Sequence, residues 1–123
     1  MPAMQNNTEL VQSLIVGFND LLDANSSQDL NEQICLHCRD IFGTLFQSIA
    51  WATTPEESDK LYDLIPAALV LIDRGRAILK ACVDRKNPDD PVSLYLNSVN
   101  EKHELLSNAN KFRSLEHLVI EQP

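Results

Sequence analysis

The chain has 123 residues, 44% of them hydrophobic, and a net charge of -8, a size that fits one domain over residues 1–123 with a core of its own. Three glycines and an aromatic content of 6% argue against both disorder and an all-β sandwich. Because phosphate backbones and anionic lipids require clustered cations, this acidic composition also argues against direct binding to nucleic acid or to a membrane.

The beginning of the sequence carries neither the cationic stretch nor the apolar segment of a secretory signal. Residues 1–6 are expected to be disordered. The three cysteines are odd in number and lack the spacing of a disulfide framework, which fits a reducing compartment. We therefore expect a cytoplasmic protein.

A first helix is predicted over residues 8–24. Asn7 is a suitable capping residue, and Glu9 places a negative charge in the first turn. Apolar residues then recur at three- and four-residue steps and share one face: Leu10, Val11, Leu14, Ile15, Phe18, Leu21 and Leu22.

A second helix is predicted over residues 28–51, by the same periodicity. Its apolar stripe consists of Leu30, Ile34, Cys38, Ile41, Leu45 and Ile49, widened by Phe42 and Phe46.

The third helix, predicted over residues 55–85, has the clearest beginning in the chain. Thr54 and Glu57 have the spacing of a capping box, and Pro55 occupies the first helical position, where its missing N–H has no cost. Pro66 removes a backbone donor further along. We expect a kink at Pro66, or a break into two helices.

The run Leu64–Ile72 contains nine uncharged, mostly aliphatic residues, and it predicts a helix that is buried nearly all round. The run is too short to cross a bilayer, which needs about 20 apolar residues. In a four-helix bundle each helix normally keeps a solvated face. We therefore expect a homodimer, whose two-fold contact would cover Ala67, Val70 or Leu71.

A loop containing Asn87-Pro88-Asp89 precedes the fourth helix, predicted over residues 91–107 with Asp90 as cap and Pro91 as first residue. A short C-terminal helix should follow, although Leu118–Ile120 could also pair as a strand, and residues 121–123 are expected to be disordered. Since the connections are short, the predicted fold is all-α: a single-domain antiparallel bundle of four main helices plus that short helix.

Soft metal ligands cluster only at Cys35-Leu36-His37-Cys38. Zinc sites usually need two separated ligand pairs, and no second pair exists. Cys35 and Cys38 also fit the apolar stripe of their helix, so we expect no metal and no cofactor, with Cys35, Cys38 and His103 as weak candidates. The P-loop, the dinucleotide fingerprint, the nucleophile elbow and the His-Glu-x-x-His helix are absent, and we expect no enzyme.

Charge gives the leading functional hypothesis. Residues 1–54 contain six acidic residues and one base, Arg39. The sequence favours a non-enzymatic interaction module: a small acidic adaptor, chaperone or inhibitor that binds a basic surface of another protein. The acidic face is expected at Asp20, Asp23, Asp29, Glu32 and Asp40.

Two alternatives stay open. The bundle core could hold a small molecule or a metal near Cys35, Cys38 and His103, which would make the protein a sensor. Regularly spaced carboxylates could instead make it an acidic mimic of DNA that blocks a nucleic-acid-binding protein.

The cations between Arg74 and Lys86 form the only basic concentration. They are expected to pair with the acidic first half of the same molecule, each surface pair being worth less than about 1 kcal/mol.

Overall fold

The computed structural model describes residues 7–24 and 29–121, with side chains to residue 112. The helices are α1 (Asn7–Ala24), α2 (Leu30–Trp51), α3 (Pro55–Asp63), α4 (Ile65–Cys82) and α5 (Pro91–Glu121). No strand occurs in this part of the chain, and none of its helices is long and apolar enough to cross a membrane. The protein is an all-α antiparallel bundle, as its sequence predicts.

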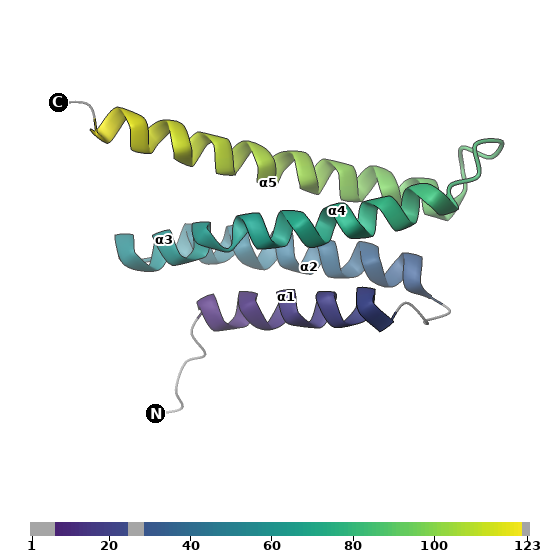
Figure 1. Ribbon diagram of the computed structural model, residues 1–123, viewed down its shortest axis with the longest axis horizontal. Helices are drawn as coiled ribbons and strands as arrows, with labels where there is room; N and C mark the ends of the chain where they lie inside the picture. The colour runs from purple at the N-terminus through teal and green to yellow at the C-terminus, as the bar shows by residue number, and fades with distance from the viewer. Residues whose placement is uncertain (1–6, 25–28, 122–123) are drawn as a thin grey trace.

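The helices are arranged in three layers (Figure 1). α2 lies beside the column formed by α3 and α4, and α1 and α5 lie on opposite sides of this pair. The chain reverses direction at each connection, apart from that between α3 and α4. α4 therefore has α1 on one flank, α5 on the other and α2 behind it.

The core lies where the layers meet. α1 contributes Phe18 and α2 contributes Ile34 and Leu45, all fully buried. Ile72 and Leu79 of α4 are also fully buried, and α3 and α5 add Leu61, Val99 and Leu106. Phe18, Ile34 and Leu45 occupy the apolar stripes predicted for the first two helices, and burial of the core side chains is the main stabilising contribution to the fold.

The column of α3 and α4 is broken at Leu64, two residues before Pro66. Leu64 keeps a right-handed helical conformation, and its N–H bonds to Leu61 at 3.1 Å, a tighter turn than the α-helical pattern. Pro66 then lies in the first turn of α4, where its missing N–H leaves no partner unsatisfied. Of the two outcomes expected at Pro66, the structure adopts the break.

The predicted beginnings of the first two helices differ by one or two residues from those of α1 and α2, and two other boundaries differ by more. α4 ends at Cys82 rather than near residue 85, because Val83 is extended and Asp84 accepts a hydrogen bond from the N–H of Lys86 in the following turn. The helix predicted over residues 91–107 and the C-terminal helix are one continuous helix, α5, which excludes a strand at Leu118–Ile120. Neither glycine nor proline interrupts that stretch.

Disorder was predicted for residues 1–6 and 121–123. Glu121 is the last residue of α5. The other positions lie outside the described residues.

Helix α4 is not buried nearly all round, and that expectation is wrong. Within Leu64–Ile72, the side chains of Ile65, Ala68 and Ile72 are fully buried, but Val70 is 62% exposed. The reason is the layering: α1 and α5 flank α4 without closing over its outer side. An apolar strip of α4 is left facing solvent.

Candidate functional site

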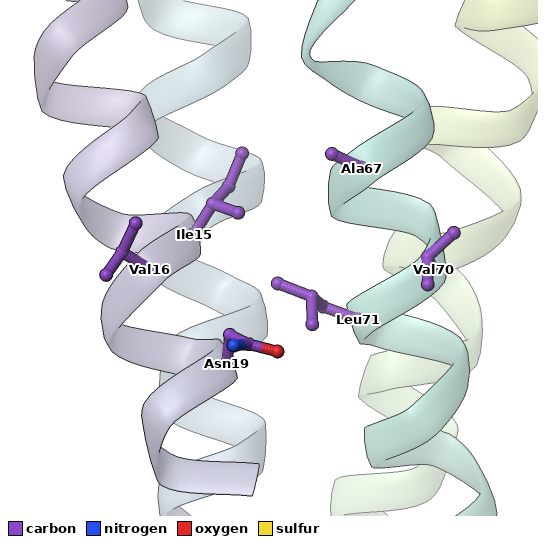
Figure 2. Close-up of a pocket in the computed structure, with 6 residues that line it drawn as sticks. All are labelled: Ile15, Val16, Asn19, Ala67, Val70 and Leu71. Carbon is purple, nitrogen blue, oxygen red and sulfur yellow. The ribbon is translucent and has the colours of Figure 1, made fainter. Parts of the chain in front are cut away.

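A largely apolar groove lies between α1 and α4. Its volume is about 360 Å³, and it is lined by Ile15, Val16, Asn19, Ala67, Val70 and Leu71. Figure 2 shows Ala67 and Leu71 directed from α4 toward α1, with Ile15 and Asn19 opposite them. The groove is the furrow between these two helices, which run parallel to one another (Figure 1).

Two valines form the edges of this groove. Val16 of α1 is 59% exposed, and Val70 of α4 is 62% exposed. Isolated exposed apolar residues are common, but an apolar furrow with apolar edges is a feature of interaction sites.

The α4 side of the groove is formed by the three residues expected at a two-fold contact, Ala67, Val70 and Leu71. Ala67 and Val70 are exposed, as a contact surface requires, whereas Leu71 is only 6% exposed and forms the floor. The α1 side of the groove was not predicted from the sequence. Ile15 fits the apolar core stripe of its helix, and Val16 stands alone on a polar face, where it gives no periodic signal.

A polar cluster closes one end of the groove. The guanidinium of Arg74 donates to Asn19 Oδ1 at 3.0 Å and to Asp23 Oδ1 at 2.9 Å. The side-chain amide of Asn19 in turn donates to Asp23 at 3.4 Å. The expected pairing of these cations with the acidic first half of the molecule is confirmed for Arg74, whose bond to Asp23 joins α4 to α1.

All five predicted acidic-face residues are exposed. Asp20 and Asp23 lie near the end of α1, and Asp29 and Glu32 lie at the beginning of α2, so these four share one end of the bundle (Figure 1). Asp40 lies two helical turns further along α2. Asp20 follows Val16 by one turn, so it lies on the same side of α1 as this edge of the groove.

A second hollow lies between α4 and α5. It has a volume of about 400 Å³ and is lined by Arg76, Lys80, Leu96 and Asn100. Beside it, Asp73 receives a hydrogen bond from Arg76 and lies 3.1 Å from His103 Nε2.

The weak metal candidates do not form a site. No three His, Cys, Asp or Glu side chains gather around a point that could hold a metal ion anywhere in the described residues. Cys38 is buried in the core, whereas His103 faces Asp73 on α4. Burial, and secondarily the neighbouring Cys35, raises the pKa of the Cys38 thiol to about 12, so the thiolate that a metal requires is disfavoured.

Comparisons of the chain with protein-family models, with curated proteins and with solved structures find no match.

Proposed function

We propose that this protein is a non-enzymatic interaction module that binds a basic amphipathic helix of a partner protein in the groove between α1 and α4. The exposed apolar edges at Val16 and Val70 are the observation that supports this function most directly. A helix binds such a groove through apolar side chains at three- and four-residue spacing.

Charge favours a basic partner over a second copy of the chain. Asp20 lies one helical turn beyond the Val16 edge of the groove and makes no hydrogen bond or ion pair with any described residue. Each copy carries a net charge of -8, so two copies repel one another, whereas a basic helix is attracted and oriented by the acidic edge. A homodimer through Ala67 and Val70 is the competing occupant.

The experiment measures binding of a synthetic helix with a leucine stripe and lysines elsewhere, by fluorescence anisotropy, against a matched helix in which glutamate replaces lysine. The basic helix should bind and the acidic helix should not. Light scattering on the free protein at micromolar concentration tests the competing occupant. A dimer that the V70D substitution dissociates would assign the groove to a second copy of the chain.

The V70D variant separates docking from simple charge attraction. It adds a negative charge to an exposed position, so nonspecific attraction of the basic helix would strengthen. If the apolar groove is the docking site, binding must weaken instead. L94D is the matched control, because Leu94 is 58% exposed on α5 and does not line the groove. Equal effects of V70D and L94D would contradict the proposed site.

A further inference from the structure

The hollow between α4 and α5 is built differently from the groove, since two cations and an amide line it. Arg76 and Lys80 are one turn apart on α4, and Leu96 and Asn100 are one turn apart on α5. The two helices pack side by side, so the two pairs face each other across the hollow. This arrangement places two positive charges and a side-chain amide donor around one space.

The two cations differ in how they are held. Arg76 donates through one terminal nitrogen to Asp73 and is 34% exposed at its side chain. A guanidinium has five N–H donors in a fixed fork, so this bond orients the group and leaves further donors for a ligand. Within the described part of the chain, Lys80 makes no ion pair or hydrogen bond, and its ammonium has all three donors available.

The charges around the hollow favour a small anion over an extended one. Asp73 offsets one of the two positive charges, and the loop from Asp84 to Asp90 carries three acids and two bases. The positive field is therefore confined to the hollow and cannot follow an extended polyanion such as a nucleic acid. Leu96 adds an apolar wall on one side.

We infer that the hollow lined by Arg76, Lys80, Leu96 and Asn100 binds a small organic anion, a carboxylate or phosphate monoester whose apolar portion lies against Leu96. The charged hydrogen bonds from Arg76 and Lys80 would hold the anionic group, as is general for such pairs, and Asn100 would donate a further bond. This site is independent of the groove between α1 and α4.

The test uses phenyl phosphate as the probe, with inorganic phosphate and phenol as comparisons, in an NMR titration at constant ionic strength. Phenyl phosphate should produce saturable shifts confined to the backbone amides around residues 76–80 and 96–100. Inorganic phosphate should bind the same residues more weakly because it lacks the apolar portion, and phenol should bind least.

Substitutions at two exposed positions, Lys80 and Lys60, decide whether the site is specific. K80A should weaken phenyl phosphate binding at least about tenfold, the usual effect of losing a charged hydrogen bond, and K80R should restore most of it. K60A removes an exposed cation of α3 away from the hollow and should leave binding unchanged. Unsaturable shifts in the unmodified protein, or equal losses in K80A and K60A, would overturn the inference.

Discussion

Gly75 of α4 faces Ile34 of α2 so closely that a Cβ atom added to the glycine would lie 2.8 Å from Ile34 Cγ2. Real Cβ atoms essentially never come so near to another heavy atom. The contacting methyl group is the β-branch of Ile34, which cannot rotate away freely, and Phe18 Cζ would lie at 3.1 Å on the same side. Gly75 therefore sets how closely the two helices approach.

We expect G75A to destabilise the protein by about 1–3 kcal/mol, the usual cost of overpacking a core, despite the better helix propensity of alanine. G17A and G43A are matched controls, because nothing lies within 4 Å of a Cβ at either position. Each control should be neutral or stabilising by up to about 1 kcal/mol. Urea denaturation measures all three, and an unchanged midpoint for G75A would show that α4 shifts freely.

Ile34 provides a second check on this contact. I34A removes the clashing methyl group and leaves a cavity of its own, costing about 2–5 kcal/mol. If the clash explains the effect of G75A, the double variant must be more stable than the sum of the two single changes indicates. Simple additivity in the denaturation midpoints would refute the clash.

The local features of this fold could be predicted from the sequence, because they depend on neighbouring residues. Thr54 accepts a hydrogen bond from the N–H of Glu57 at 3.2 Å, as the capping box requires. Asp90 likewise accepts from the N–H of Val92 at 3.1 Å, next to the predicted first residue Pro91. Both predicted helix beginnings are confirmed.

Features that depend on which helices meet could not be predicted in the same way. The need for glycine at position 75 arises from residues on α1 and α2, and the bond from Arg74 to Asp23 joins positions 51 apart in the sequence. The exposure of Val70 follows from the layering, since periodicity says how apolar a helix is but not how many neighbours it receives.

The capping box itself can be tested. T54A should destabilise the protein by about 1 kcal/mol, the typical value of an N-cap, because the N–H of Glu57 loses its partner. T54S keeps the accepting hydroxyl and should restore most of the loss. The measurement is the urea midpoint at constant pH, and equal midpoints for T54A and T54S would show that the side-chain hydrogen bond is not what matters.

The bond between Arg74 and Asp23 should contribute little to stability. The side chains are 43% and 61% exposed, and exposed pairs are typically worth less than about 1 kcal/mol. D23N should therefore lower the free energy of unfolding by roughly a few tenths of a kcal/mol at low salt. This loss should shrink at high salt because ions screen the pair. D20N is the control, since Asp20 has no partner among the described residues. A cost for D23N that is independent of salt would point to packing instead of charge.

The three cysteines should differ in reactivity. Cys82 is exposed, Cys35 is half-buried and Cys38 is buried. The thiolate is the reactive form, and burial keeps Cys38 protonated at neutral pH by raising its pKa to about 12. Iodoacetamide should label Cys82 first and Cys38 only on unfolding, as mass spectrometry of digested protein would show. Labelling of Cys38 as fast as Cys82 would contradict the buried core position.

Burial of Cys38 also predicts how stability depends on pH. In the unfolded chain this thiol titrates near its ordinary pKa of 9.0, whereas in the folded protein it keeps its proton up to about pH 12. Between these values the unfolded state binds fewer protons than the folded state, so the free energy of unfolding must fall as pH rises. Its contribution is fully present below pH 9.

C38A removes the titrating group and should flatten this alkaline decline in urea denaturation series, although the variant is less stable overall because it leaves a small cavity. C82A removes an exposed thiol and should leave the slope unchanged. Identical slopes in C38A and the unmodified protein would show that another group governs the alkaline transition.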